Sequence, residues 1–319
     1  MIHNTAVIGA GTMGRNIALT FAMHGFSVFV FDPAEAVRNS LKDRLQKELT
    51  LLVEEGMIQS EDIADILESI HVSDTLEECV QDADYIIEAA PEVLALKQDL
   101  LTQIDQAAPV HAIIGTNTSS LKLVDITAKL PENRRSKCIV CHWYNPAHLI
   151  PMVELSFFGN MSEEDYEDVS SLYENCGKVP VKVLKDIPGM IANRLLHAQA
   201  REVFYLDSIG AASKEDLDKA LMFGPCFRNA TTGMFECADM GGLDIWMAGE
   251  NNFFPHLDNS TEANPVMQEH VARGELGVKT GKGYYDYTGD RGDSIEKEFE
   301  KRLIRQLMTS RYYLDNCVS

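Results

Sequence analysis

Three closely spaced glycines near the start of the chain constrain its fold more than any other feature. They stand as Gly9-Ala-Gly11-Thr-Met-Gly14, between one apolar run and a helix-periodic segment that leads to a second apolar run at residues 28–31. The order strand, glycine turn, helix and strand is typical of a βαβ unit that binds a dinucleotide. A nucleotide-free doubly wound domain with a fortuitous glycine turn is the alternative interpretation.

Each glycine of this turn has its own physical reason. Gly9 permits a tight turn, Gly11 lets backbone N–H groups approach a pyrophosphate, and Gly14 lets the helix lie close to the sheet. The phosphates would then lie at the positive end of the helix dipole. Thr12 and Met13, at the start of that helix, are expected to line the same cofactor site.

An acidic residue ends the second apolar run and selects the type of cofactor. Asp32 follows Gly14 by 18 residues, where its carboxylate can accept both hydroxyls of an adenosine ribose. The same carboxylate would repel the 2′-phosphate of NADP. We therefore predict NAD as the cofactor.

Length and charge limit the possible classes of protein. The chain has 319 residues, a length that favours two domains. Its 28 basic and 49 acidic residues give a net charge of −21, which argues against nucleic acid or an anionic membrane as a partner. A small anionic substrate stays compatible with this charge, because a local basic pocket can outweigh distant acidic residues.

We expect a cytoplasmic location. The first apolar strand begins within five residues of Met1, which leaves no room for a signal peptide. No apolar run approaches the roughly 18–20 residues of a transmembrane helix. The seven cysteines are odd in number and scattered along the chain, as a reducing compartment favours.

Beyond Asp32, strand-like apolar runs alternate with helix-periodic segments. This alternation predicts an α/β domain with a doubly wound, Rossmann-type parallel sheet that helices cover on both faces. The further strands are predicted at 70–73, 84–88, 112–116, 138–142, 152–156 and 179–184. Helices are predicted over 34–69 with a break at Glu55-Gly56, over 94–107, over 121–130 and over 163–176.

The pattern changes at Asp186-Ile-Pro188-Gly189, a cluster of residues that interrupt regular structure. We predict an NAD-binding domain over residues 1–187 and an all-α C-terminal domain over residues 188–319. Except at residues 283–287, the second domain is helix-periodic or loop, and it ends in a long charged helix over 294–314.

Candidate catalytic residues gather where predicted strands end, which is the edge at which doubly wound sheets bind ligands. Ser119 lies in the polar run after one strand, His142 ends the next, and Glu154 lies in the strand after that. Asn193 opens the first helix of the second domain. Taken singly, each has an ordinary structural alternative: a satisfied histidine, a helix cap for Ser119, or a common helix residue for Asn193.

Together these residues predict a dehydrogenase. His142 can act as the general base that takes a hydroxyl proton as hydride leaves, because an imidazole titrates near neutrality. Glu154 stands in an apolar strand, where an unpaired carboxylate is costly, so it is expected to pair with His142 and to orient its ring. Ser119 and Asn193 can hydrogen-bond the substrate oxygen where charge develops.

A metal site is not expected. Cys138 and Cys141 have the spacing of a metal or redox pair, but they lie in an apparently buried strand with no second ligand pair. The histidines other than His142 show no metal-ligand spacing, and we interpret them as structural or surface residues.

Taken together, the motifs resemble the 3-hydroxyacyl-CoA dehydrogenase family over nearly the whole chain. The matching segments are the Gly9–Gly14 turn, Ile-Glu88-Ala-Ala-Pro-Glu92, Asn117-Thr-Ser119-Ser-Leu, His142-Trp-Tyr-Asn145-Pro, Pro-Met-Val-Glu154, Asp-Ile-Pro188-Gly-Met-Ile-Ala-Asn193-Arg194, Gly241-Gly-Leu-Asp244 and Gly277-Val-Lys279-Thr-Gly-Lys-Gly283-Tyr-Tyr. The resemblance implies oxidation of an (S)-3-hydroxyl to a ketone with NAD, with His142 as base and Glu154 as its partner.

The resemblance also implies cofactor contacts and an oligomer. Its cofactor-binding positions correspond here to Glu92, Lys97, Asn117, Ser119, Asn145 and Lys279. Relatives dimerise through the helical domain, so a homodimer is the expectation.

The substrate class stays open at this point. The family as a whole favours a 3-hydroxyacyl-CoA, and CoA-using relatives carry lysines on the helical segment after the second strand. Here that segment is basic early, at Arg38, Lys42, Arg44 and Lys47, and acidic later. With an arginine at position 228, the chain resembles sibling enzymes of the family that oxidise free carboxylates such as carnitine, gulonate or a pyridine carboxylic acid. A guanidinium binds carboxylates well. Arg228 could instead tie a carboxylate across a dimer interface. The other class that remains is a non-catalytic, crystallin-like NAD-binding protein or redox sensor.

Overall fold

A computed structural model describes residues 2–315 of the chain. These residues form two compact units. The first unit comprises residues 2–192 together with Glu300–Met308, and the second comprises Asn193–Phe299 together with residues 309–315. The predicted fold class, a doubly wound α/β domain followed by a helical domain, is confirmed.

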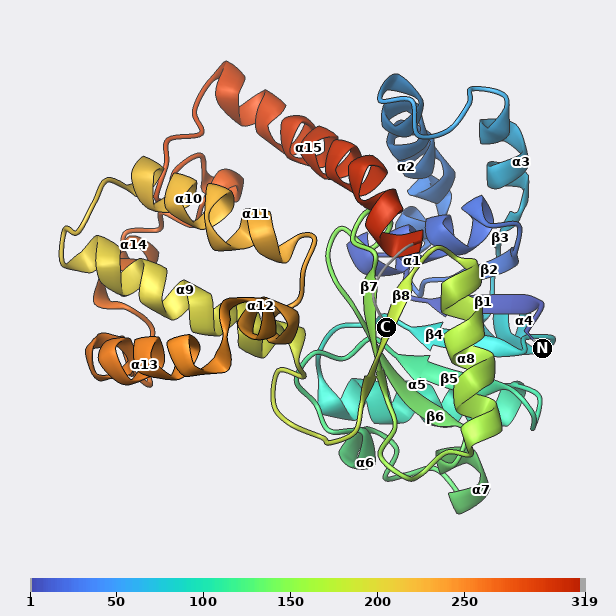
Figure 1. Cartoon of the computed structure of the whole chain (residues 1–319). Coiled ribbons are helices and arrows are strands. Elements are labelled where there is room, and N and C mark those ends of the chain that lie inside the picture. Colours follow the sequence, from blue (N-terminus) through green and yellow to red (C-terminus); the bar gives the residue numbers. More distant parts are fainter. Residues whose placement is uncertain (1, 316–319) are drawn as a thin grey trace. The chain divides into compact units, whose positions relative to one another are not determined.

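One eight-stranded sheet forms the centre of the first unit (Figure 1). Its strands are β1 (Asn4–Ile8), β2 (Ser27–Phe31), β3 (Ile70–Val72), β4 (Tyr85–Glu88), β5 (Ile113–Thr116), β6 (Cys138–Trp143), β7 (Met152–Ser156) and β8 (Val179–Val183). They lie in the order β3-β2-β1-β4-β5-β6-β7-β8. The chain builds outward in opposite directions from β1, so the ends of β1 and β4 flank the crevice where such sheets bind ligands.

One pair of strands departs from the predicted parallel pattern. The first six strands of the sheet, β3, β2, β1, β4, β5 and β6, are parallel. Strands β7 and β8 are parallel to each other, but β7 runs antiparallel to β6. Only residues 144–151 connect β6 to β7. A parallel crossover needs a dozen or more residues, so this short connection forces the chain to reverse.

Helices cover both faces of the sheet in the first unit (Figure 1). They are α1 (Thr12–Met23), α2 (Glu35–Glu54), α3 (Asp62–Glu68), α4 (Leu76–Val80), α5 (Leu94–Ala107), α6 (Leu123–Ile126), α7 (Glu132–Arg135) and α8 (Glu163–Asn175). One apolar core contains Phe21 of α1, Leu45 of α2 and Tyr173 of α8. The other contains Leu101 and Ile104 of α5. The sheet is therefore buried on both sides, as its nearly continuous apolar strands predict.

The glycine turn after β1 is built as the sequence predicts. Gly9 adopts φ +99°, a conformation that residues with a side chain rarely take. A Cβ atom at Gly14 would lie 1.7 Å from the carbonyl oxygen of Gly9. The first turn of α1 can therefore approach β1 this closely only because Gly14 has no side chain.

The helix predicted over 121–130 is shorter in the structure, where α6 spans only Leu123–Ile126. The side-chain amide of Gln98 donates to the carbonyl of Asp125 at 2.7 Å, a carbonyl that the next turn of a longer helix would need. Beyond Thr127 the chain continues with tighter i→i+3 bonds, from Ala128 to Asp125 at 3.3 Å and from Leu130 to Thr127 at 3.0 Å.

The second unit is helical. It contains α9 (Ala192–Ser208), of which Ala192 still counts with the first unit, α10 (Lys214–Phe223), α11 (Pro225–Asn229), α12 (Met234–Gly241), α13 (Leu243–Phe253), α14 (Pro265–Ala272), most of α15 (Asp290–Asp315) and the 3₁₀ turns η1 (Phe254–His256) and η2 (Val278–Thr280). No strand forms in the described part of this unit. Near residues 283–287, Lys282 makes two isolated bridges, to Gly277 and Asp286.

The middle of α15 packs in the first unit. Ile304 is fully buried there, and the Arg305 guanidinium lies 2.7 Å from the Glu55 carboxylate. Residues 300–308 thereby extend the apolar core under α1 and α2. Among residues 2–315, no helix is both long enough and apolar enough to cross a membrane.

Candidate active site

Strand register places His142 and Glu154 directly opposite each other on β6 and β7. Residues paired in this way point to the same face of an antiparallel sheet. Nδ1 of His142 lies 2.7 Å from Oε2 of Glu154. The exposed fraction of the side chain is 6% for His142 and 0% for Glu154, so the contact is shielded from water.

The second carboxylate oxygen of Glu154 accepts two hydrogen bonds from the backbone. Oε1 accepts from the backbone N–H of Ile191 at 2.7 Å and from that of Ala192 at 2.9 Å. Burial raises the pKa of the Glu154 carboxyl, but the bonds from His142, Ala192 and Ile191 outweigh it and hold this pKa below its ordinary value. Glu154 is therefore an anion that is fixed at both oxygens.

This arrangement leaves one ring nitrogen of His142 for chemistry. With Nδ1 donating to Glu154, the neutral ring presents Nε2 as an acceptor. Nε2 has no hydrogen bond to another residue in the part of the chain that the structure describes. The geometry is that of a general base with its orienting acid.

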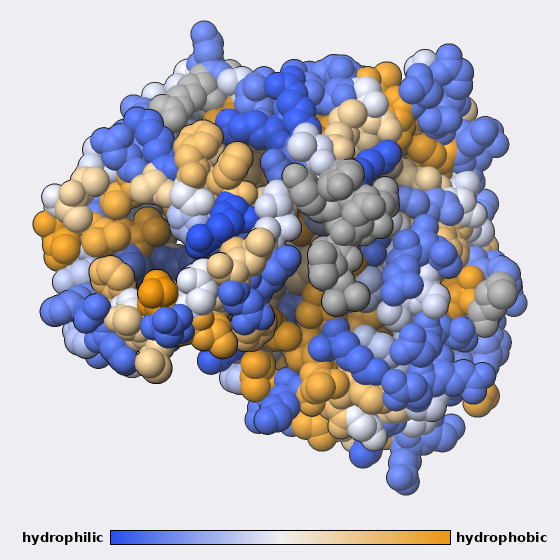
Figure 2. All heavy atoms as spheres, viewed as in Figure 1, coloured by the Kyte–Doolittle hydropathy of each residue, from blue (hydrophilic) through white to orange (hydrophobic). Residues whose placement is uncertain are grey.

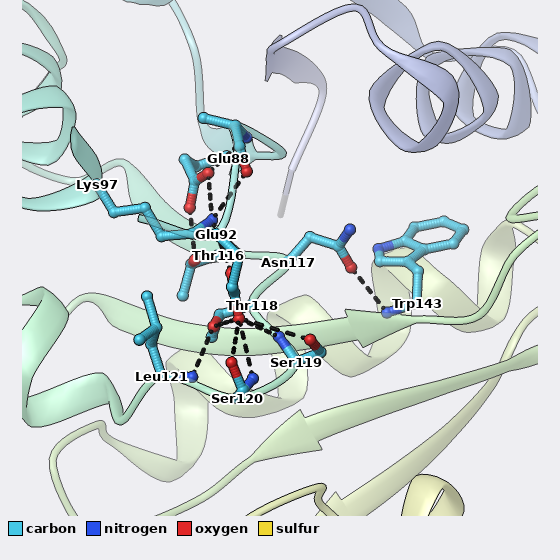
Figure 3. Close-up of polar contacts among 11 residues, drawn as sticks. Glu88, Glu92, Lys97, Thr116, Asn117, Thr118, Ser119, Ser120, Leu121 and Trp143 are labelled. Carbon is cyan, nitrogen blue, oxygen red and sulfur yellow. Dashed lines mark hydrogen bonds and ion pairs between the residues drawn. The ribbon is translucent and has the colours of Figure 1, made fainter. Parts of the chain in front are cut away.

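The loop that follows β5 contains Ser119 and is gathered around one carboxylate (Figure 3). Oε1 of Glu92 accepts from the Thr118 hydroxyl at 2.6 Å and from the backbone N–H groups of Ser119 and Ser120, both at 2.9 Å. Burial raises the pKa of Glu92, but the Thr118 bond, these amides and the nearby Lys97 ammonium together lower it to about 2. Ser119 is exposed, and its hydroxyl donates to the same oxygen at 3.5 Å.

Asn117 ties the same loop to the histidine strand. Its side-chain oxygen accepts from the backbone N–H of Trp143 at 3.0 Å, one residue after His142 (Figure 3). The Ser119 loop and the end of β6 are therefore joined directly. Asn145 lies just beyond, exposed, at the cis peptide bond with Pro146.

A buried ion pair supports this region from the interior of the first unit. Nζ of Lys97 lies 2.7 Å from Oε1 of Glu88 and 3.5 Å from Oε2 of Glu92. Glu88 also accepts from the Thr116 hydroxyl at 2.5 Å and from the Ala90 N–H at 2.6 Å. Since the Lys97 side chain is only 1% exposed, the ammonium lies inside the protein rather than at the surface.

Glu88 and Thr118 were not singled out as site residues from the sequence. The signal for Glu88 is the same one that indicates Glu154, a carboxylate in an apolar strand. Thr118 carries no comparable signal, because its neighbours Ser119 and Ser120 have the same chemistry.

The glycine turn provides open space at the start of α1. Gly11 is the N-cap residue and no side chain caps the helix, so the first N–H groups of α1 are not blocked by a side chain. A Cβ atom at Gly11 would meet nothing within 4 Å. Thr12 and Met13 follow as the first helical residues, with Thr12 exposed. This end of α1 fits a pyrophosphate.

Asp32 lies beside this turn, as the motif requires. Oδ2 accepts from the N–H of Ala10 at 2.8 Å, and Oδ1 accepts from the N–H of Ala34 at 2.9 Å. These bonds fix the carboxylate at the end of β2 next to the glycines. A carboxylate held here fits the ribose of an adenosine without a 2′-phosphate.

The remaining candidates lie in the second unit. Asn193 follows Ala192, whose N–H binds Glu154, and is the second residue of α9. Arg228 lies in α11 and Lys279 in η2, and both are exposed. In the described part of the chain, neither of these two side chains has a hydrogen bond or an ion pair.

The cysteine pair of β6 lies in the core. Burial raises the pKa of the Cys138 and Cys141 thiols to about 12. The Cys141 sulfur accepts from the Tyr85 hydroxyl at 3.1 Å. Within residues 2–315, no group of three His, Cys, Asp or Glu side chains could hold a metal ion.

Models of a known family match nearly the whole chain. The NAD binding domain of 3-hydroxyacyl-CoA dehydrogenase matches residues 4–187, and the C-terminal domain of the same family matches residues 189–287. A probable 3-hydroxybutyryl-CoA dehydrogenase of Bacillus subtilis is 35% identical over 288 residues, which cover 90% of this chain and 98% of the relative.

A second kind of relative matches over a greater length. The 5-formyl-3-hydroxy-2-methylpyridine 4-carboxylate 5-dehydrogenase of Mesorhizobium japonicum is 30% identical over 305 residues, 95% of this chain and 97% of the relative. A crystal structure of a dehydrogenase of that name, described as an NAD⁺-dependent dismutase, has a TM-score of 0.87 at 29% identity and covers 99% of both chains. The chain binds NAD, is an oxidoreductase, and belongs to the 3-hydroxyacyl-CoA dehydrogenase family.

Proposed function

We propose that the protein oxidises a hydroxyl group to a carbonyl, with His142 as the general base. The contact of His142 with the fixed Glu154 anion carries this proposal. When bound, NAD supplies the acceptor for the hydride that leaves the alcohol carbon. Nε2 of His142 takes the hydroxyl proton, and Glu154 stabilises the imidazolium that forms. In the reverse direction the same nitrogen returns the proton.

Two further residues act on the substrate oxygen in this proposal. The Ser119 hydroxyl is exposed on a loop that Asn117 ties to the end of β6, and Asn193 directly follows the amides that hold Glu154. Both side chains can donate a hydrogen bond to the oxygen as charge develops on it.

The cofactor site we propose follows the glycine turn. Gly9, Gly11, Thr12, Met13 and Gly14 would hold the pyrophosphate, and Asp32 would hold the adenosine ribose. Further contacts are proposed for Asn117, Ser119, Asn145 and Lys279, on the family pattern, whereas Glu92 is proposed to act through the loop that it binds. Lys97 is enclosed by Glu88, Glu92 and the carbonyl of Ala90, so we propose that it acts through Glu92.

A free hydroxy or oxo carboxylate is the substrate class that we favour. The chain matches the pyridine-carboxylate dehydrogenase structure over 99% of both lengths, with a TM-score of 0.87. The Arg228 guanidinium makes no ion pair in the part of the chain that the structure describes, so it is available for a carboxylate. Over α2 and α3, where a CoA phosphate would need cations, acidic residues outnumber basic ones.

A 3-hydroxyacyl-CoA is the second candidate. The 35% identity to the Bacillus subtilis relative favours it, as do the four basic residues of α2, which are Arg38, Lys42, Arg44 and Lys47. Two of these cations are already engaged. Lys42 donates to the carbonyl of Leu67 at 2.9 Å, and Arg38 donates to that of Asp32 at 2.7 Å.

A substrate screen separates these candidates. NADH absorbance would be followed with acetoacetyl-CoA, with free 3-oxo and 3-hydroxy acids, and with formylpyridine carboxylates. We expect turnover of a free carboxylate that exceeds turnover of acetoacetyl-CoA, and loss of that turnover in His142→Gln. Preference for acetoacetyl-CoA would select the second candidate. NADH binding without turnover of any compound would favour the non-catalytic alternative.

We also propose a homodimer formed by the helical unit. Large apolar side chains are exposed on it, among them Phe235 at 92%, Met240 at 80% and Phe227 at 71%. Figure 2 shows hydrophobic surface over the helices of this unit. Patches of this kind mark association surfaces. Light scattering of the wild type and of Phe235→Glu tests the proposal, with a dimer expected for the wild type and dissociation for the variant.

A cytoplasmic location is proposed as well. It rests on the scattered, odd set of seven cysteines, which suits a reducing compartment. Fractionation of the source cells with an antibody to the chain tests it.

A further inference from the structure

A single oxygen atom, Oε1 of Glu92, binds the loop of residues 117–121 that contains Ser119 (the Ser119 loop). In addition to the Thr118 hydroxyl and the two backbone amides, Oε1 of Glu92 accepts from the Ser120 hydroxyl at 3.0 Å and from the Ser119 hydroxyl at 3.5 Å. Donors from three consecutive residues therefore converge on one point (Figure 3). Hydrogen bonds to an ionised acceptor are roughly twice as strong as neutral ones, so this carboxylate restrains the loop strongly.

The Thr118 hydroxyl makes this restraint directional. The Thr118 oxygen accepts from the backbone N–H of Leu121 at 3.1 Å, while the hydroxyl hydrogen is donated to Glu92. Both hydrogen bonds together fix the direction of the hydroxyl. Thr118 is buried, whereas Ser119 and Ser120 are exposed. The loop thus has one fixed residue inside and two residues that Glu92 holds at the surface.

A buried cation keeps Glu92 itself in place. Lys97 lies 3.5 Å from Oε2, the oxygen that does not bind the loop. Lys97 cannot follow a movement of Glu92, because it also binds Glu88 at 2.7 Å and the carbonyl of Ala90 at 3.2 Å. The chain of contacts runs from the end of β4, through α5, to the loop after β5.

We propose that Glu92 is a positioning residue for Ser119, and that Lys97 and Glu88 act with it. The proposal rests on the proposed role of Ser119 at the substrate oxygen. Ser119 is exposed, and without this restraint its hydroxyl would occupy the reactive geometry for only a fraction of the time. Errors of about 1 Å in such positions cost up to roughly a hundredfold in rate.

A double-mutant cycle tests the coupling. Glu92→Gln keeps the shape but replaces the anion with a weaker, neutral acceptor, and Thr118→Val removes the buried donor without changing the side-chain volume much. We expect each variant to lower kcat roughly tenfold to a hundredfold, with a much smaller change in the NADH dissociation constant. The double variant should lose no more than either single variant, because both changes break one restraint.

The control for this cycle lies on α5, the helix that carries Lys97. Asp99→Asn removes a carboxylate of α5 that pairs with exposed Lys129 and does not contact the loop. This variant should keep the wild-type kcat. Additive losses in the double variant, or a raised NADH dissociation constant with normal kcat, would assign Glu92 to direct cofactor contact and overturn the proposal.

Hydrogen exchange gives a readout that does not depend on turnover. We expect amides of residues 117–121 to exchange faster in Glu92→Gln and in Thr118→Val than in the wild type, while β5 stays protected. Unchanged exchange in this segment overturns the restraint. Faster exchange with unchanged kcat overturns the positioning role. If the wild type oxidises none of the screened compounds, the proposed function fails, and the exchange measurement still decides whether Glu92 holds the loop.

Discussion

Lys97 and Glu88 form an ion pair of 2.7 Å whose two side chains are 1% and 0% exposed. Removing one partner of such a pair leaves an uncompensated buried charge. We expect Lys97→Met to lower the free energy of unfolding by about 3–5 kcal/mol, measured by urea denaturation.

Two comparison variants make the Lys97 prediction specific. Adding Glu88→Gln to Lys97→Met should recover part of the loss, because it removes the uncompensated charge, and the amide oxygen can still accept from the Ala90 N–H while the amide NH2 donates to the Thr116 hydroxyl. Lys129→Met breaks the exposed pair with Asp99, in which the Lys129 side chain is 49% exposed. It should cost less than about 1 kcal/mol. Equal losses in Lys97→Met and Lys129→Met would contradict the buried-charge explanation.

His142→Gln should lower kcat by roughly 10²- to 10⁴-fold, the range that general-base catalysis contributes. NADH binding, followed by fluorescence, should stay close to that of the wild type, because the glycine turn and Asp32 are untouched. Retained turnover in this variant would remove His142 from the role of base.

The stability of the wild type should fall as the pH is lowered below about 6.5. Burial, with smaller contributions from Lys178 and Arg15, lowers the pKa of His148 to about 3, against an ordinary value of 6.5. Between these values the unfolded chain binds a proton at this position that the folded chain does not, so the free energy of unfolding decreases with falling pH. In His148→Gln, urea denaturation between pH 7 and pH 5 should show a shallower dependence. An identical slope in both proteins would show that His148 is not buried in its neutral form.

Two glycine variants should separate folding from cofactor binding. Gly14→Ala places a Cβ atom 1.7 Å from the Gly9 carbonyl oxygen and should destabilise the first unit. Gly11→Ala meets nothing within 4 Å, so thermal unfolding should be unchanged. We expect its NADH dissociation constant to rise at least about tenfold, equivalent to about 1.4 kcal/mol. Normal NADH affinity in Gly11→Ala would place the pyrophosphate elsewhere.

Arg228→Met should raise the KM of a free carboxylate substrate roughly tenfold to a hundredfold, since hydrogen bonds to charged groups contribute about 1.5–3 kcal/mol. Arg273→Met is the matched control, because Arg273 is a half-exposed arginine of the same unit that pairs with Glu275. Steady-state kinetics of both variants decide the question. An unaltered KM in Arg228→Met would assign Arg228 a structural role.

The doubly wound fold could be predicted because each part of it has a local signal. The glycine turn, the apolar strands and the helix-periodic segments each follow from residues that are close in sequence. The Glu154 carboxylate lies in an apolar run, where an unpaired charge is costly, so a partner could be predicted. His142 was the nearest suitable residue at the same edge of the sheet. The antiparallel pairing of β7 with β6 was not predicted, although the short connection at 144–151 indicates it.

The support beneath the site could not be predicted in the same way. Glu88 ends a strand and Lys97 lies on the following helix, and which face of that helix meets the strand end depends on packing. The convergence on Glu92 depends on the backbone conformation of residues 118–120. A run of hydroxyl-bearing residues gives no local indication of which one turns inward.

The reversal between β6 and β7 also bears on how such enzymes diverge. Backbone pairing, rather than the intervening turn, sets the distance between His142 and Glu154. Exposed positions of the connection, such as Asn145, can therefore change without moving this pair, whereas Ala147 and Leu149 are held in the core. Divergence at this point is thus open to the surface residues of the connection and closed to its buried ones.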